Sequence, residues 1–223
     1  MILSGTIPIS DALRSAAIAI EPDARVNSGQ TLAYQRELIA EFELNPQVPH
    51  DIRVHFETAK NLFLYAWFVY RFYPVAKQHA LATLEFALRE RLALIDVDRY
   101  RKDAKPRLTL YPLLQAAEKE SLISNTGLRA YHRRAAQQAR ERVSETAGRL
   151  LWAFEADSVE YDLDSAVPQD EDYAWDTLKT YQEVLPKIRN IYAHGSSSLT
   201  ANVLGTFETV ADLVNQLYPS SSV

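Results

Sequence analysis

The chain has 223 residues, of which 47% are hydrophobic and 24% charged, so it is long enough to bury a core of its own. It contains no cysteine, which excludes disulfides, thiolate metal sites and cysteine nucleophiles. Its net charge of -5 gives no overall attraction to nucleic acid, although a local basic strip could still hold RNA. Glycine is scarce, whereas Ala and Leu are abundant, and this composition favours helices.

Residues 1–50 are uneven and are predicted to form an N-terminal extension that packs on the main body. Short helices are expected at DALRSAAIAI (residues 11–20) and at TLAYQRELIAEFEL (residues 31–44), with a loop-like stretch between them. Pro46 and Pro49 end the segment. The first ten residues, MILSGTIPIS, lack the basic region and the long apolar run of a signal peptide.

Residues 51–223 are predicted to form one helical domain that begins with two hydrophobic helices. Asp51 is suited to cap a helix that runs to Tyr73, and Pro74 either kinks this helix or sits in the first turn of a new one. Residues 62–73, LFLYAWFVYRFY, are too few to span a bilayer and predict a core helix. The next helix has an apolar stripe at helical spacing: Leu81, Leu84, Leu88, Leu92 and Ile95.

The second half of the chain predicts further helices. A short helix is expected around Pro112, and a long one from Arg129 to Phe154. A helical pattern restarts near Trp175, is broken or kinked at Pro186, and a last amphipathic helix covers residues 203–217. The sequence therefore predicts an all-α bundle of about six to eight helices and, with no long apolar run, a cytoplasmic protein without membrane contact.

Charge is concentrated in two neighbouring segments. Residues 129–149 hold six arginines and two acids, whereas residues 155–176 hold nine acids and neither Lys nor Arg. A solvated helix face is the commoner explanation of the basic strip, and an RNA track is the other; Arg133, Arg134 and Arg140 are its candidate RNA-binding residues. The acidic segment is interpreted as a disordered connector, as a shield for the basic strip, or as a binding site for an antitoxin.

The stretch PKIRNIYAHG, residues 186–195, contains the candidate catalytic residues Arg189, Asn190 and His194. The spacing alone carries no weight, because about one such arginine–histidine pair is expected by chance. The position adds more: His194 comes near the predicted end of a helix, where the dipole favours imidazolium. Asn190 lies four residues before His194 and shares its helix face, whereas Arg189 is about 140° away on an ideal helix.

This stretch resembles the signature of HEPN domains (higher eukaryotes and prokaryotes nucleotide-binding). In that family an arginine, usually followed by a polar residue, precedes a histidine late in an α-helical bundle. The early hydrophobic helices, with HALATLEFALRERL at residues 79–92, resemble the front half of such bundles. The family often has an acid near the site, and Glu85 is the matching position. Glu85 and Arg89 are four residues apart and could pair on the flank of their helix.

The resemblance implies a metal-independent endoribonuclease of a prokaryotic toxin–antitoxin or phage-defence system, active as a homodimer and without a cofactor. His194 would move the proton of the ribose 2′-hydroxyl, which attacks the adjacent phosphate and leaves a 2′,3′-cyclic phosphate. Arg189 would stabilise the charge on the phosphoryl group, and Asn190 would position its neighbours. Some toxin members carry a tyrosine that the antitoxin modifies where this chain has Ser196, which departs from that mode of regulation.

A non-catalytic helical module that binds nucleotide or a protein partner is the alternative, because some HEPN domains have no activity. In that case Arg189 and His194 are structural. The other histidines have no metal-ligand spacing on one helix and are interpreted as ordinary residues: His50, His55, His79 and His132.

Overall fold

The computed structural model of the chain describes residues 21–26, 29, 31–100, 108–153, 162–193 and 200–220. Within these residues it contains eight α-helices and no strand, so the prediction of an all-α fold is confirmed. The helices are α1 (Leu32–Ala40), α2 (His50–Tyr65), α3 (Phe72–Ala93), α4 (Val97–Tyr100), α5 (Leu110–Lys119), α6 (Arg129–Trp152), α7 (Thr177–Ala193) and α8 (Leu204–Leu217), with 3-10 helices η2 (Asn125–Gly127) and η3 (Asp170–Tyr173).

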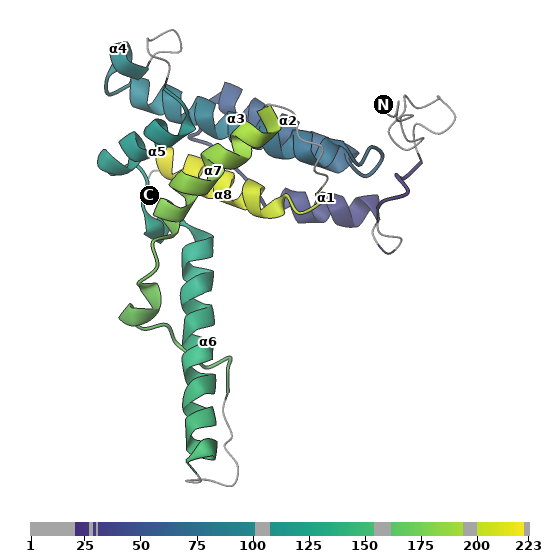
Figure 1. The fold of residues 1–223 in the computed structure, drawn as a ribbon. Helices are drawn as coiled ribbons and strands as arrows, with labels where there is room; N and C mark the ends of the chain where they lie inside the picture. The colour runs from purple at the N-terminus through teal and green to yellow at the C-terminus, as the bar shows by residue number, and fades with distance from the viewer. Residues whose placement is uncertain are drawn as a thin grey trace, which may run out of the picture.

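The chain divides in space into two regions (Figure 1). Helices α1, α2, α3, α5, α7 and α8 pack together into a bundle, which we call the body. Helix α6 projects away from the body, and residues 162–176 return along it; we call α6 and this returning segment the stalk. Two ion pairs tie the first turns of α6 to α8, from Arg129 to Asp212 at 2.7 Å and from Arg133 to Glu208 at 2.5 Å.

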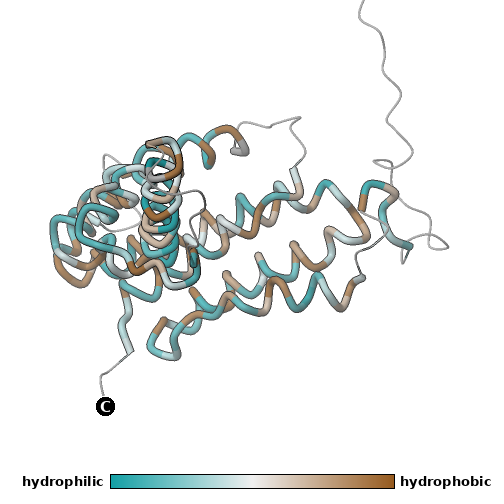
Figure 2. Tube along the Cα trace, turned by 90° about the horizontal axis from the view of Figure 1, so that it is seen from below, coloured by the Kyte–Doolittle hydropathy of each residue, from teal (hydrophilic) through white to brown (hydrophobic). Residues whose placement is uncertain are grey.

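Helix α3 is the centre of the body and packs against both α2 and α8. Phe207 of α8 meets Phe56 and Phe63 of α2 edge to face, with ring centroids 5.8 and 5.9 Å apart. Hydrophobic and hydrophilic positions alternate along the body helices, as amphipathic packing requires (Figure 2). Ile95 follows the end of α3 and is 48% exposed, but the other residues of the predicted apolar stripe are all buried: Leu81, Leu84, Leu88 and Leu92.

The first hydrophobic helix ends at Tyr65, so the prediction that it runs to Tyr73 is wrong. Pro74 has no N–H to donate to the carbonyl of Tyr70 and its ring would clash with that carbonyl, so one continuous helix is disfavoured. Pro74 lies instead in the first turn of α3, as the alternative prediction had it. The N-cap residue of α2 is Pro49 and not Asp51 as expected, because the helix already begins at His50; Asp51 lies in its first turn.

Asp23 holds the turn between α2 and α3. Its backbone N–H donates to the carbonyl of Trp67 at 2.9 Å, and its carboxylate accepts the N–H of Tyr70 at 3.1 Å. Burial raises the pKa of Asp23, but hydrogen bonds from Arg25 and Tyr70 outweigh burial and lower this pKa to about 2. The carboxylate is therefore a fixed point of the turn.

The described part of the N-terminal segment shares the core of the body. Gln35 of α1 donates to the carbonyl of Phe63 at 2.6 Å and accepts the hydroxyl of Tyr73 at 2.8 Å. Ile39 and Val48 are buried in the same hydrophobic cluster as α2, α3 and α8. The helix predicted at residues 11–20 lies outside the described residues.

The stalk is built differently from the body. The described side chains that α6 buries are alanines, spaced so that they share one face: Ala135, Ala139 and Ala147. Arg142 reaches Asp172 of the returning segment at 2.6 Å, and Arg140 lies 3.6 Å from Asp164. Residues 162–176 thus lie against the basic strip, as the shield interpretation of the acidic segment predicts.

Helix α7 returns the chain to the body and carries the candidate motif. The Asp176 carboxylate accepts a hydrogen bond from the N–H of Lys179 at 2.9 Å and so caps the first turn of α7. Pro186 lies inside the helix without ending it, because α7 continues to Ala193. Within the described residues, no helix combines the length and the apolar character that crossing a membrane requires.

Candidate functional site

The candidate site lies where α7 packs on α3. Leu178 and Leu185 of α7 are buried in the body, and Arg189 follows Leu185 by one helical turn. This spacing brings Arg189 to the side of α7 that faces α3, with 38% of its side chain exposed. On α3, Glu85 and Arg89 lie on the same face, because they are also four residues apart.

Glu85 is a buried carboxylate shared by two arginines. One oxygen lies 3.0 Å from Arg89 and the other lies 3.3 Å from Arg189. The residues Glu85 and Arg89 are only 8% and 6% exposed, so the predicted ion pair forms, but inside the protein and not on the flank of the helix. Arg89 also donates to the backbone carbonyl of Leu108. A buried charge is costly unless it is paired, so Glu85 fixes both guanidinium groups in place.

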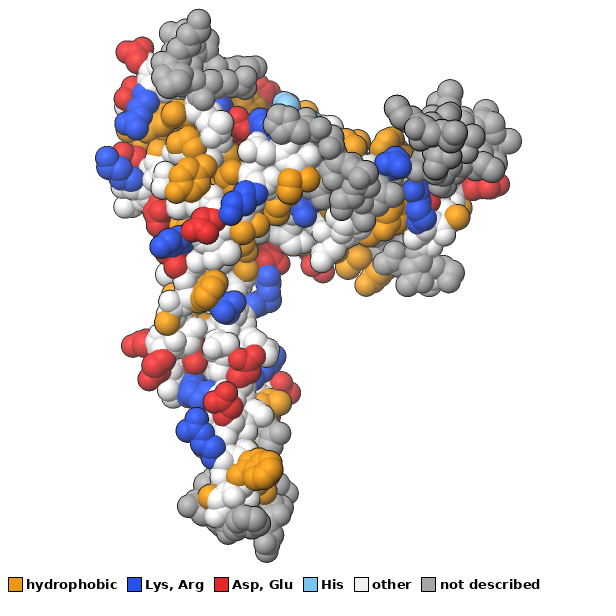
Figure 3. Space-filling model, in the orientation of Figure 1, with side chains coloured by type: hydrophobic (Ala, Val, Ile, Leu, Met, Phe, Trp, Pro, Cys, Tyr) orange, Lys and Arg blue, Asp and Glu red, His pale blue; other side chains and the backbone are white. Residues whose placement is uncertain are grey.

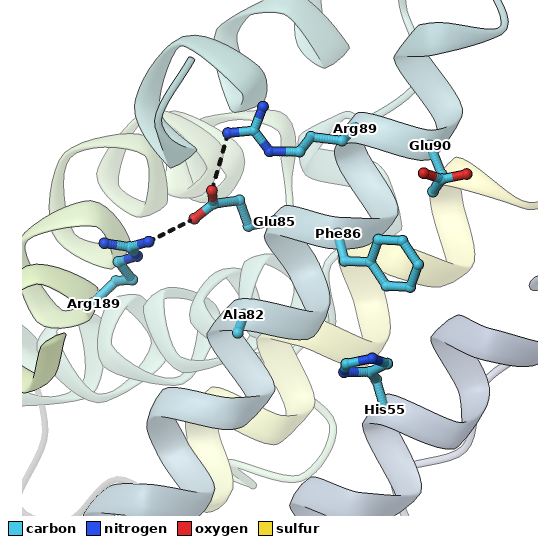
Figure 4. Close-up of a pocket in the computed structure, with 7 residues that line it drawn as sticks. All are labelled: His55, Ala82, Glu85, Phe86, Arg89, Glu90 and Arg189. Carbon is cyan, nitrogen blue, oxygen red and sulfur yellow. Dashed lines mark hydrogen bonds and ion pairs between the residues drawn. The ribbon is translucent and has the colours of Figure 1, made fainter. Parts of the chain in front are cut away.

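A pocket of about 280 Å³ opens beside this cluster (Figure 4). Ala82 contributes a small side chain to its lining, and Phe86 contributes an apolar one. The guanidinium group of Arg189 and the carboxylate of Glu85 point toward each other at one side of the pocket. The full lining is His55, Ala82, Glu85, Phe86, Arg89, Glu90 and Arg189.

The candidate catalytic residues fall partly within the described chain. Arg189 lines the pocket, and Asn190, the next residue of α7, is exposed. His194 lies outside the described residues; it is the next residue in sequence after Ala193, where α7 ends. The pocket therefore brings together Arg189 and Glu85 from the predicted set, together with Arg89.

His55, interpreted from the sequence as an ordinary residue, lines the pocket. Its ring stacks on that of His79 with centroids 5.4 Å apart and an interplanar angle of 9°, and it meets Phe86 edge to face at 5.3 Å. Burial lowers the pKa of His79, and the neighbouring His55 lowers it further. The two histidines come from different helices, so no spacing along one helix could have identified the pair.

The three candidate RNA-binding arginines lie on the stalk and do not line the pocket. Arg133 pairs with Glu208, and Arg140 pairs with Asp164. Arg134 stacks over the ring of Trp175, with its guanidinium carbon 4.2 Å from the ring centroid. Basic and acidic side chains are intermixed along the stalk (Figure 3).

The geometry supports binding of an anion at Arg189, because more than a third of this guanidinium-bearing side chain remains exposed while Glu85 orients it. Among the residues that the structure describes, no group of three or more His, Asp or Glu side chains is placed to hold a metal ion. Comparison with protein-family models, with curated proteins and with solved structures finds no match to this chain.

Proposed function

We propose that this protein is a HEPN-type endoribonuclease that cuts RNA without a metal ion, in a prokaryotic toxin or phage-defence system. The observation that carries the proposal is the contact between Arg189 and Glu85 at the pocket. Arg189 belongs to the motif that resembles the HEPN signature, and Glu85 is the acid that the resemblance places near it. Their meeting across α3 and α7 supports the resemblance independently of the motif spacing.

The proposed reaction is an internal transesterification of RNA. The imidazole of His194 accepts the proton of the 2′-hydroxyl, whose oxygen forms a bond to the adjacent phosphorus. The bond from phosphorus to the 5′-oxygen breaks, and this oxygen takes up a proton from solvent water, which leaves one fragment with a 5′-hydroxyl and the other with a 2′,3′-cyclic phosphate end. Arg189 stabilises the negative charge that builds on the phosphoryl oxygens, while Glu85 keeps the guanidinium in position. Asn190 positions its neighbours in the motif.

The proposal includes a homodimer in which two copies of the motif share one cleft. Helix α7 exposes two large apolar side chains for a contact with a second copy, and they lie about 140–160° round the helix axis from Arg189. Val184 is 40% exposed and Ile191 is 55% exposed. Burying such side chains against a second copy would be favourable.

The test is cleavage of mixed RNA by the purified protein in the presence of EDTA. We expect the unaltered protein to leave cyclic-phosphate ends, and His194→Ala and Arg189→Gln each to lower the rate by about 100-fold or more. Arg149→Gln is the matched control, because Arg149 is an exposed arginine of the stalk that pairs only with Glu145 of its own helix among the described residues. Circular dichroism establishes that each variant is folded.

A non-catalytic module that binds nucleotide or a protein partner is the second candidate, and one observation favours it. Arg189 already has a carboxylate partner, as a structural arginine does. This candidate predicts no cleavage by any of the proteins, but nucleotide binding that Arg189→Gln weakens. Equal cleavage by the unaltered protein and by His194→Ala contradicts the ribonuclease proposal.

A further inference from the structure

The pocket holds a histidine to which the proposed reaction gives no role. His55 belongs to α2, on the side of the pocket away from Arg189, and the face of α3 lies between them (Figure 4). Its ring is held by its stack on His79 and by the edge contact with Phe86, and no described residue forms a hydrogen bond to it. An imidazole that is fixed at a pocket wall with free ring nitrogens is available to a ligand.

The charge of the pocket depends on this histidine. The other charged residues that line it are two arginines, Arg89 and Arg189, and two glutamates, Glu85 and Glu90, whose formal charges cancel. Arg89 is further committed to Glu85 and to the carbonyl of Leu108. A phosphate diester is anionic, so a second cation beside Arg189 would strengthen its binding.

His79 is the less solvated member of the histidine pair. The Nε2 atom of His79 is buried and has no hydrogen-bond partner. Its pKa is lowered by burial and by the neighbouring His55, and an imidazolium in that position would be poorly solvated. His55 is exposed, so it is the member of the pair that can carry the charge. The ring of His79, stacked beneath it, also offers its π face to a cation.

We propose that His55 binds a phosphate of the RNA in its imidazolium form, from the wall of the pocket opposite Arg189. The inference rests on the proposed function, since it names a contact to the same substrate. Histidine changes its charge between about pH 5 and pH 8. Imidazolium is favoured at the acidic end of this range, so a contact from a histidine makes binding of RNA tighter there.

The test measures binding separately from cleavage. The probe is a fluorescent 2′-O-methyl RNA oligonucleotide, which has no 2′-hydroxyl to attack, and its anisotropy is followed at pH 5.5, 6.5 and 8.0. We expect the unaltered protein to bind about tenfold more tightly at pH 5.5 than at pH 8.0. One hydrogen bond to a charged group supplies a gain in affinity of this size. His55→Gln loses most of this difference, whereas His55→Arg binds tightly at every pH.

His50→Gln is the matched control, because His50 is an exposed histidine of the same helix that does not line the pocket. It keeps the pH dependence of the unaltered protein. If His55→Gln also keeps it, the inference is overturned, while cleavage that depends on His194 and Arg189 leaves the proposed function standing. If the unaltered protein neither cleaves RNA nor binds the probe at any pH, the proposed function fails and the inference fails with it.

Discussion

In the body, Phe56, Phe63 and Phe207 bury their rings against one another, whereas the described side chains that α6 buries are alanines. The returning segment is held to α6 by ion pairs, such as Arg142 with Asp172, and by ring contacts, such as Tyr131 with Tyr173, whose centroids lie 5.2 Å apart. Burial of large apolar side chains contributes far more to folding than ion pairs near the surface do. The body is therefore the stable unit, and the stalk is a helix with a weakly attached partner segment.

The difference matters for the site, because residues 162–176 lead directly into α7. Asn125, which belongs to η2, accepts the N–H of Leu178 at 2.7 Å and donates to the Asp176 carboxylate at 3.0 Å. These bonds anchor the start of α7 to η2, which contacts α8 of the body, at the point where the chain leaves the stalk. Arg189 and Glu85 are thus insulated from opening of the stalk, and changes in the two regions are expected to have separate effects.

Phe207→Ala is expected to have the largest effect, because the ring is fully buried between α2 and α8. Removing a buried phenylalanine costs about 3–5 kcal/mol of the free energy of unfolding. Trp152→Ala removes an even larger ring at the end of α6, but this residue is 85% exposed, and we expect a change of less than about 0.5 kcal/mol. Urea denaturation followed by circular dichroism measures both. Equal midpoints for the two variants would contradict the distinction between body and stalk.

Asp23→Asn is expected to have an intermediate effect, because it acts on a buried polar anchor of the body. The folded-state pKa of Asp23 lies near 2, below the ordinary value of 3.8, and this shift corresponds to about 2 kcal/mol. Because the folded pKa is lowered, the contribution is complete above about pH 4 and is lost as the pH falls through about 2. The difference in unfolding free energy between Asp23→Asn and the unaltered protein should therefore be about 2 kcal/mol at pH 6 and should shrink toward pH 2.

Asp98→Asn serves as the control for this titration, because Asp98 is an exposed aspartate in the first turn of α4. It should change the free energy of unfolding little at either pH. A difference for Asp23→Asn that stays constant between pH 6 and pH 2 would show that the carboxylate charge does not hold the turn.

The helices of the body were predictable from the sequence because amphipathic spacing is a local property. Leu81, Leu84 and Leu88 predict α3, and Pro74 marks where it begins. The end of α2 at Tyr65 was not predictable, because Asp23 reaches the turn from a distant part of the chain. Long-range hydrogen bonds of this kind leave no periodic signal.

The candidate site was predictable only in part, for the same reason. The spacing of Glu85 and Arg89 predicts their ion pair, but not that both are buried. The approach of Arg189 to Glu85 was expected from the family resemblance and not from any spacing in the sequence. The place of His55 in the pocket depends on how α2 packs on α3, which neither helix encodes alone.

Arg142→Gln is expected to have the smallest effect on overall stability and to act on the stalk alone. Arg142 joins Asp172 and the carbonyl of Val167 to α6, and its hydrogen bond, with that from the Gln169 N–H, lowers the pKa of Asp172. Without the guanidinium, the returning segment separates from α6 more often, while the core of the body is unchanged. We expect endoproteinase Glu-C to cut after Glu171 about three to ten times faster, with an unaltered urea midpoint.

Arg149→Gln, whose partner Glu145 lies on the same exposed face of α6, should leave the cutting rate unchanged. A lowered urea midpoint for Arg142→Gln would mean that the stalk and the body unfold as one unit, because only then would a contact in the stalk contribute to the stability of the core.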